Sequence, residues 1–264
     1  MCIQKSVGPN SPNEFEDVKV VQILLNLNQT RSGGATLSTD GVFGSNTENA
    51  IAAFQRTVMG SAAPDSRVDP NGATLRELCA GIPDGFSDLK LRAIMPSARE
   101  SDIAKYFPQL LPTMVTNEID SALRQAHFLA QIGHESAALR FSEELASGDA
   151  YEGRADLGNT QPGDGPRFKG RGLIQLTGRA NYTKYGIAKG RDFLEGDNPK
   201  LIATDPQLAV DVACWFWNVH HLNDVADADD AEKLTRRING GLNGLESRLA
   251  YLARSKAFLR VASE

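Results

Sequence analysis

Two carboxylic acids near the end of a predicted helix could carry out acid–base chemistry. Glu135 ends an amphipathic stretch, and Glu144 follows nine residues later with Glu143 beside it. Hydrolysis of a glycosidic bond needs two such groups, one protonated to supply the leaving oxygen with a proton and one ionised to activate water. Glu135 suits the proton donor, because partial burial and the negative end of a helix dipole both disfavour a charged carboxylate. The residues alone leave open the alternative of a glutamate at an exposed helix end.

A polar segment flanked by glycines could line the cleft that such a pair requires. Residues 168–182 read Phe-Lys-Gly-Arg-Gly-Leu-Ile-Gln-Leu-Thr-Gly-Arg-Ala-Asn-Tyr, a poor core sequence with many groups that could hydrogen-bond to a sugar. On one uninterrupted helix, Glu135 and Glu144 would point about 180° apart. The helix must therefore end or bend after Glu135 if both carboxyl groups are to face one cleft.

These segments, taken with Ile238-Asn239-Gly240-Gly241, resemble the catalytic domain of glycoside hydrolase family 19, which comprises chitinases and the muramidases of phages and bacteria. The resemblance implies a lysozyme-like, mostly helical domain with a substrate cleft and an inverting mechanism. It also implies that Glu135 is the acid and that Glu144 is the second carboxylate. Glu143 would be the base if the turn is one residue shorter. Glu152 is a further candidate, because the residues after Glu144 depart from the pattern usual in phage relatives.

The same resemblance gives roles to residues of the polar segment. Thr177 would hydrogen-bond the attacking water, although a threonine here could also satisfy local backbone groups. Arg248 would be a charge partner near the acid–base pair. Tyr182 would bind substrate but could equally belong to the core. The full set of expected substrate-binding residues is Gln175, Asn181, Tyr182, Asn239 and Arg248.

A shorter helical unit precedes this region. Residues 16–27 place apolar side chains on one helical stripe, and Asp40-Gly41-Val42-Phe43-Gly44 supplies a tight turn before the next helix. Ser45 and Glu48 form a predicted capping box for that helix, and a third helix is expected over 73–79. The run from Asp40 resembles the type-1 peptidoglycan-binding module. The alternative is a generic helical bundle in which the same residues only build a loop.

The predicted fold class is mainly α in two domains. We expect a three-helix peptidoglycan-binding domain over 1–82, a linker over 83–95 and the catalytic domain over 96–264. Within the last, helices are predicted over 117–135 and 229–238, and Asp205-Pro206 should open another, with Trp215 and Phe216 in its buried stripe. Asn243 and Glu246 are expected to cap the final helix.

Bulk properties exclude several classes of function. A net charge of −5 argues against general nucleic-acid binding, and no apolar run is long enough for membrane insertion. The N-terminus lacks the pattern of a signal peptide, so we expect the protein to stay in the host cytoplasm until a separate membrane-permeabilising protein releases it to the periplasm or cell wall. Cys79 and Cys214 are predicted to be buried free thiols, and neither a metal, a cofactor nor an oligomer is expected.

The leading hypothesis is therefore an endolysin, a muramidase that cuts bacterial peptidoglycan between N-acetylmuramic acid and N-acetylglucosamine. A chitinase is the first alternative, because family members share these residues. A zinc peptidase of the cell wall is the second: His134-Glu135 matches the start of His-Glu-x-x-His, but Ala138 stands where the second histidine belongs. A non-catalytic wall-binding protein is the last.

Overall fold

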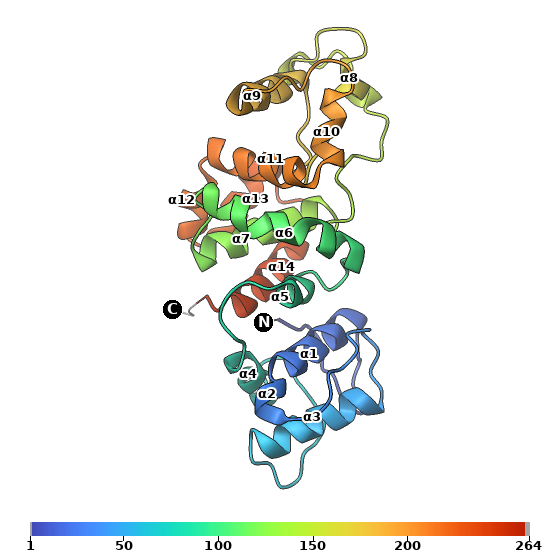
Figure 1. The fold of residues 1–264 in the computed structure, drawn as a ribbon, viewed down its shortest axis with the longest axis vertical. Helices are drawn as coiled ribbons and strands as arrows, with labels where there is room; N and C mark the ends of the chain where they lie inside the picture. The colour runs from blue at the N-terminus through green and yellow to red at the C-terminus, as the bar shows by residue number, and fades with distance from the viewer. Residues whose placement is uncertain (1, 262–264) are drawn as a thin grey trace. The chain divides into compact units, whose positions relative to one another are not determined.

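The computed structural model describes residues 2–261 and consists of helices joined by loops (Figure 1). The predicted mainly α class is confirmed, since the β pairings within this range are isolated bridges such as Val7 with Val68. The chain divides into two compact units, Met1–Ser97 with Ala250–Glu264, and Ala98–Leu249. Among the helices described, none combines the length and apolar character needed to cross a membrane.

The first unit contains the three predicted N-terminal helices and two more. The stripe expected on the first helix is buried, since Val18, Val21, Leu24 and Leu25 are at most 5% exposed. The helices are α1 (Phe15–Leu27), α2 (Gln29–Ser32), α3 (Ser45–Thr57), α4 (Ala73–Ala80) and α5 (Asp88–Ile94).

The turn before α3 is fixed by a buried glutamine of α1. The side-chain amide of Gln22 donates to Asp40 Oδ1 at 2.9 Å and to Thr47 Oγ1 at 3.2 Å, and its oxygen accepts from Gly41 N at 2.9 Å. Gly41 has a φ of +72°, and a Cβ there would lie 2.4 Å from the ring of Phe15. Only glycine fits this position, because both the backbone conformation and the close ring exclude a side chain.

Both predicted capping boxes are wrong. α3 begins at Ser45 itself, with the extended Gly44 as its N-cap and no side-chain cap. α14 (Leu245–Phe258) begins after Gly244, whose carbonyl accepts from Arg248 N at 3.0 Å, so Asn243 lies outside the cap position. In each case a glycine directly precedes the first helical residue, so no side chain occupies the capping position.

The residues expected as a linker, 83–95, contain the packed helix α5. Ser87 caps it by accepting from Lys90 N at 3.3 Å, and Leu91 and Ile94 are fully buried. The stretch belongs to the first compact unit.

Two cysteines meet in the first unit. Cys2 Sγ lies 3.8 Å from Cys79 Sγ, and all three cysteines are free thiols. Cys214 is buried as predicted, and burial raises the pKa of its thiol. Cys79 is a free thiol as predicted, but it is only half-buried, so the predicted burial is wrong.

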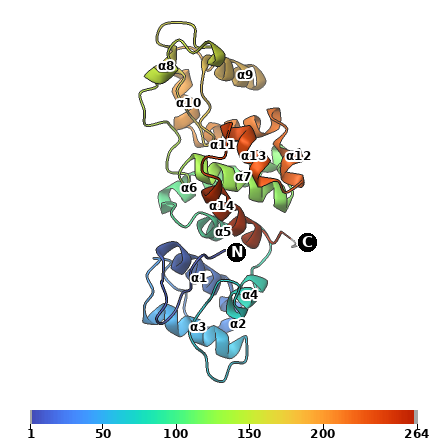
Figure 2. The ribbon, with the colours of Figure 1, turned by 180° about the vertical axis from the view of Figure 1, so that it is seen from behind.

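The second unit is built from helices on both sides of residues 136–178, and Figure 2 shows them from behind. A long segment of loop and short 3₁₀ turns, 136–178, separates the first two helices from the rest and includes one short α-helix. The helices are α6 (Glu100–Thr116), α7 (Ala122–Glu135), α8 (Asp164–Arg167), α9 (Arg179–Lys189), α10 (Asn198–Thr204), α11 (Pro206–Val219), α12 (Leu222–Asp227), α13 (Ala231–Asn239) and the start of α14.

The predicted helix boundaries match the structure at the end of α7 and at the start of α11 and are shifted elsewhere. α7 ends at Glu135 as required, but it starts at Ala122 rather than 117, because the chain turns at Glu118 (φ +60°) and Ser121 caps the new helix. Asp205 caps α11 by accepting from the backbone N of Gln207 and Leu208, as predicted. α13 starts at Ala231 rather than 229, because Asp230 caps it by accepting from Lys233 N, and it ends at Asn239, one residue later than predicted, with Gly240 in the left-handed conformation.

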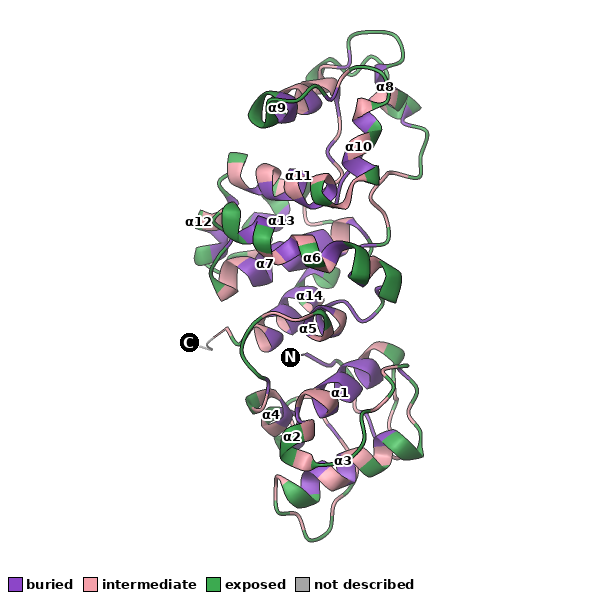
Figure 3. Ribbon diagram, viewed as in Figure 1, coloured by how far each residue is buried: buried purple, intermediate pink, exposed green. Residues whose placement is uncertain are grey.

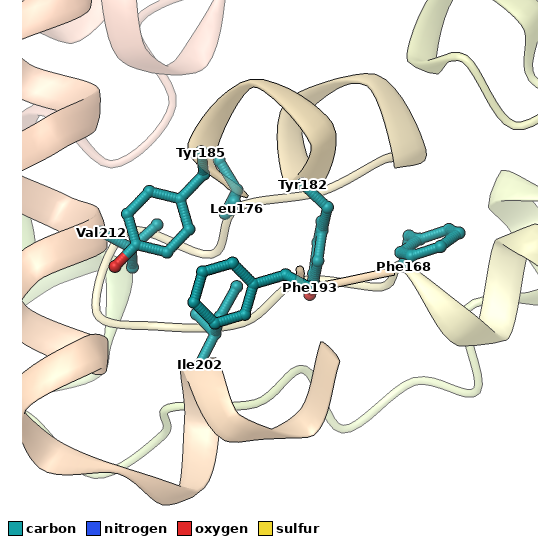
Figure 4. Packing of buried hydrophobic residues seen from close by; sticks show 7 residues of the cluster. All are labelled: Phe168, Leu176, Tyr182, Tyr185, Phe193, Ile202 and Val212. Atoms are coloured by element: carbon teal, nitrogen blue, oxygen red, sulfur yellow. The ribbon is translucent and has the colours of Figure 1, made fainter. Parts of the chain in front are cut away.

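An aromatic cluster fills the core beneath the polar segment (Figure 4). Figure 3 shows that α11 carries both buried and partly buried residues. Trp215 and Phe216, predicted to be buried, are half-buried and pack against the cluster from outside, whereas Trp217 is 1% exposed. Trp217 Nε1 donates to Asn223 Oδ1 at 2.7 Å, which satisfies its one polar group. The cluster consists of Phe168, Leu176, Tyr182, Tyr185, Phe193, Ile202 and Val212.

Candidate active site

Glu135 is the last residue of α7, and a buried cation holds its carboxylate. Arg248 Nη2 lies 2.5 Å from Glu135 Oε1, and Arg248 Nη1 hydrogen-bonds the side-chain oxygen of Gln131, one turn earlier on α7. The Arg248 side chain is only 2% exposed, and the Glu135 side chain is 20% exposed. The guanidinium therefore links α14 to one face of α7 and leaves part of the carboxylate open to a ligand.

His134 packs against the backbone that precedes α14. A Cβ at Gly244 would lie 2.1 Å from His134 Cε1, and Gly244 has a φ of +72°. Burial lowers the pKa of His134, with a smaller contribution from the nearby Arg248 cation. The ring is therefore neutral at neutral pH, and its contact with Gly244 fixes the end of α7 beside α14.

The chain reverses after Glu135 through three consecutive left-handed residues. Ala137, Ala138 and Leu139 have φ values of +48°, +57° and +67°. Ser136 supports the turn, since its hydroxyl donates to Ile132 O at 2.6 Å and accepts from Leu139 N at 2.8 Å. This turn supplies the required break, because residues beyond it no longer follow the direction of α7.

Glu144 is held by neutral donors. Tyr151 Oη donates to Glu144 Oε1 at 3.0 Å, and Gly170 N donates to Glu144 Oε2 at 3.1 Å. Burial, together with the bond to Glu144, raises the pKa of Tyr151, so the phenol keeps the proton that it donates. Lys169 Nζ bonds the backbone oxygen of Glu144 at 3.0 Å rather than its carboxylate.

The two alternative carboxylates have other partners. Glu143 Oε1 lies 2.9 Å from Arg171 Nε and 3.7 Å from Lys169 Nζ, and Arg171 is 3% exposed. Glu152 accepts from the backbone N of Gly163 and of Gly165 at 2.7 Å each, which fixes the start of α8. Both groups serve local structure in this arrangement.

Backbone pairing draws the polar segment to Glu144. Arg171 forms bridges with both Glu143 and Leu176, and Glu144 N donates to Gly170 O at 2.9 Å. A Cβ at Gly170 would lie 2.8 Å from Gln175 Oε1 and 3.3 Å from Glu144 Oε2. Glycine at 170 thus allows the side chains of Gln175 and Glu144 to converge on one small region.

The remaining polar residues continue from this region into α9. Thr177 Oγ1 donates to Gln175 O at 2.9 Å, and Asn181 Nδ2 donates to Thr177 O at 2.8 Å. Both side chains are half-buried, so each keeps an exposed part. The Thr177 hydroxyl therefore donates to a local backbone oxygen, which is the alternative role that the sequence left open. Its oxygen is still available as an acceptor.

Tyr182 and Asn239, both predicted to bind substrate, make structural contacts within the protein. Tyr182 is fully buried in the aromatic cluster, and its hydroxyl donates to Lys169 O at 2.8 Å while accepting from Arg171 Nη1 at 3.0 Å. Its core alternative is therefore the one observed, and Figure 4 shows the ring among Phe168 and Phe193. Asn239 is exposed and donates to Asn243 O at 3.0 Å, which closes the loop before α14.

The sequence did not predict the contributions of Gln131 and Tyr151. Gln131 lies four residues before Glu135 and therefore on the same face of α7, so helical spacing was an available signal. Tyr151 lies in an irregular loop, where no periodicity indicates which way a side chain points. Within residues 2–261, no group of three or more histidine, cysteine, aspartate or glutamate side chains is arranged to hold a metal ion.

Comparison with known proteins places this arrangement in a family. Residues 98–229 match the family described as chitinase class I, and residues 15–71 match the putative peptidoglycan binding domain. A Haemophilus influenzae protein named for its glycosyl hydrolase family 19 domain is 36% identical, over 48% of this chain and 75% of that protein. Acidic endochitinase Q of Nicotiana tabacum is 32% identical, over 57% of this chain and 68% of its own length.

Among solved structures, chitinase C of Streptomyces griseus is similar with a TM-score of 0.55 and 25% identity, covering 67% of this chain and 95% of that one. These matches define a glycoside hydrolase with an attached peptidoglycan-binding domain. The chain belongs to glycoside hydrolase family 19.

Proposed function

We propose that the protein is a muramidase of the endolysin type, which hydrolyses the β-1,4 bond between N-acetylmuramic acid and N-acetylglucosamine in peptidoglycan. One observation carries this proposal: a family 19 hydrolase unit and a peptidoglycan-binding domain occur in one chain. A weak wall anchor raises the concentration of a linked enzyme on an insoluble polymer, so the fusion favours the wall as the substrate.

In the proposed mechanism, Glu135 protonates the leaving oxygen. Arg248, at 2.5 Å, supports that step because it stabilises the carboxylate that remains once the proton has left. Partial exposure of the Glu135 side chain leaves its carboxyl able to contact substrate.

Glu144 takes the proton of the attacking water. Hydrogen bonds from Tyr151 and Gly170 hold it as an acceptor without a neutralising cation, which suits a base. Glu143 is the poorer candidate, because Arg171 and Lys169 already engage its carboxylate. The Thr177 hydroxyl oxygen and the Gln175 side chain lie along the same segment and would position the water and the sugar. Asn181 would add an amide donor.

A chitinase is the second candidate, favoured by the endochitinase relatives named above. The two functions differ in the sugar left at the new reducing end. Purified sacculi and chitin oligomers should be digested separately, reduced with borohydride and analysed by mass spectrometry. We expect the reduced N-acetylmuramic acid end from sacculi at a rate at least tenfold above chitin cleavage. Release of only reduced N-acetylglucosamine ends would contradict the muramidase.

The stereochemistry tests the proposed mechanism separately. An inverting enzyme holds water between carboxyls about 6.5–9.5 Å apart and gives the α-anomer first from a β-linked substrate. Proton NMR during early hydrolysis should show that anomer. We also propose a monomer that acts from the cytoplasmic side after a separate protein permeabilises the membrane. Lysis from outside by addition of protein to intact cells would argue against the need for that step.

A further inference from the structure

The first unit carries a groove of about 380 Å³ with an unusual lining. It lies between the end of α1, α2, the loop 33–38 and one face of α3. Among the described residues that line it, no side chain is charged and none is aromatic. The side chains that bear on its chemistry are the amides of Asn26, Gln29, Asn46 and Asn49 and the methyl groups of Ala50 and Ala53.

One wall of the groove is held rigid by two of these amides. Asn26 exchanges two hydrogen bonds with the backbone of Leu37, at 2.9 Å to its oxygen and 2.8 Å from its nitrogen. Gln29 donates to Gly34 O at 2.8 Å and accepts from Thr36 Oγ1 at 3.1 Å. The loop therefore has a fixed shape before any ligand arrives, which lowers the ordering cost of binding.

The opposite wall offers free hydrogen-bonding groups. Asn46 and Asn49 are exposed on α3, and within residues 2–261 neither side chain has a hydrogen-bond partner in the protein. Each supplies two donors and one acceptor. Ala50 and Ala53 lie beside them and leave room for small apolar groups.

We propose that this groove is the ligand-binding site of the first unit and that it takes secondary amides that bear a neighbouring methyl group. This inference rests on the proposed wall-degrading function. Side-chain amides pair with the donor and acceptor of a secondary amide, and the alanine surface accepts its methyl group. Without a cation the groove gives no counter-charge to a carboxylate, and without an aromatic ring it gives no stacking platform for a pyranose face.

Peptidoglycan supplies this chemistry from two sources, the acetamido groups of the glycan and the alanyl residues of the stem peptide. The volume, near the low end of the roughly 300–1,000 Å³ typical of ligand sites, suits a ligand of two or three units.

The test uses the full chain with Glu135→Gln, so that the wall is not digested. Binding to purified sacculi is measured by co-sedimentation for the parent and for Asn49→Trp, which fills the groove from an exposed position. The matched control is Arg56→Trp, on the same helix, exposed and outside the groove lining. We expect Asn49→Trp to weaken sedimentation at least tenfold and Arg56→Trp to change it less than twofold.

A second variant covers the case in which the bulky residue disturbs folding. Asn46→Ala with Asn49→Ala removes the free amides without adding volume and should weaken binding at least fivefold. Wild-type binding by both groove variants would overturn the site.

NMR titrations then separate the sources. Tri-N-acetylglucosamine and a synthetic L-Ala-D-Glu-L-Lys-D-Ala peptide are added separately while the amide signals of Gly33, Gly34 and Asn49 are followed. Shifts with the sugar alone assign the glycan, and shifts with the peptide alone assign the stem. Shifts with neither overturn the proposed ligand class. Failure of the muramidase proposal would give a different result. The Glu135→Gln chain would still bind sacculi through the groove, but the wild-type chain would release no fragments from them.

Discussion

The surroundings of Glu135 and Glu144 differ in the kind of partner that each carboxylate has. Glu135 faces the buried cation Arg248, whereas Glu144 accepts from two neutral donors, Tyr151 and Gly170. A cation stabilises a carboxylate strongly and loses that interaction when the group is neutral. Arg248 therefore favours the state after Glu135 has given up its proton, while Glu144 can accept a proton without leaving a buried charge unpaired. The two carboxylates therefore differ in their surroundings, while the proposed roles of Glu135 as acid and Glu144 as base rest on the family resemblance.

The largest effect is expected when Glu135 can no longer donate a proton. Glu135→Gln keeps the size of the side chain but cannot donate a carboxylic proton. We expect turnover to fall by roughly 100- to 10,000-fold, the usual contribution of general acid catalysis. Hydrolysis of sacculi is followed by release of reducing ends, with Glu246→Gln, exposed on α14, as control. Activity above a tenth of wild type would remove Glu135 from the acid role.

The second test compares two adjacent glutamates. We expect Glu144→Gln to lower kcat by about 100-fold or more, because the base is lost. Glu143→Gln should leave kcat within threefold and lower the free energy of unfolding by about 1 kcal/mol, because the Glu143 side chain is 40% exposed and water screens its ion pair. Both variants are measured by kinetics and urea unfolding. The reverse pattern would assign the base to Glu143.

A smaller loss of activity is expected when the cation beside Glu135, Arg248, is replaced. Arg248→Lys keeps the charge but cannot contact Gln131 and Glu135 with one planar fork. Loss of a hydrogen bond to a charged group costs about 1.5–3 kcal/mol, so kcat should fall by about 10- to 100-fold while KM changes little. A shift of the basic limb of the kcat–pH profile would distinguish positioning of Glu135 from a purely structural role. An unchanged profile with a lowered melting temperature would contradict it.

The smallest predicted effect concerns pH. The pKa of His134 is lowered in the folded protein, so the native state binds fewer protons than the unfolded state as the pH falls. Its contribution to stability is fully present above pH 6.5, the usual value for histidine, and is lost as the pH falls through the lower folded value. His134→Gln should flatten the decrease in melting temperature below pH 6.5. An unaltered decrease would exclude His134 as its source.

The fold and much of the candidate site followed from sequence because their signals are local. Helical spacing predicted the buried stripe of α1, and Asp205-Pro206 predicted the start of α11. The end of α7 at Glu135 followed from the geometry that two facing carboxyl groups impose. Arg248 was expected near the acid–base pair, and it lies against Glu135.

Features that depend on tertiary packing were missed. Tyr182 and Trp217 are buried because aromatic neighbours cover them, and the helical stripe predicted burial of Trp215 and Phe216, which are only half-buried. The capping boxes failed because Gly44 and Gly244, each one residue away, occupy the N-cap positions. Tyr151 could not be placed, because the path of an irregular loop is set by its contacts.

The left-handed turn over 137–139 ties the spacing of the two carboxyl groups to the surrounding core. Each left-handed L-residue costs roughly 1–2 kcal/mol, so these three persist only while their environment holds them. Ala138 and Leu139 are at most 1% exposed, and that packing supplies the restraint. Gentle heating that loosens the core should therefore let this segment relax early. Activity would then be lost at a temperature at which the helices are still folded.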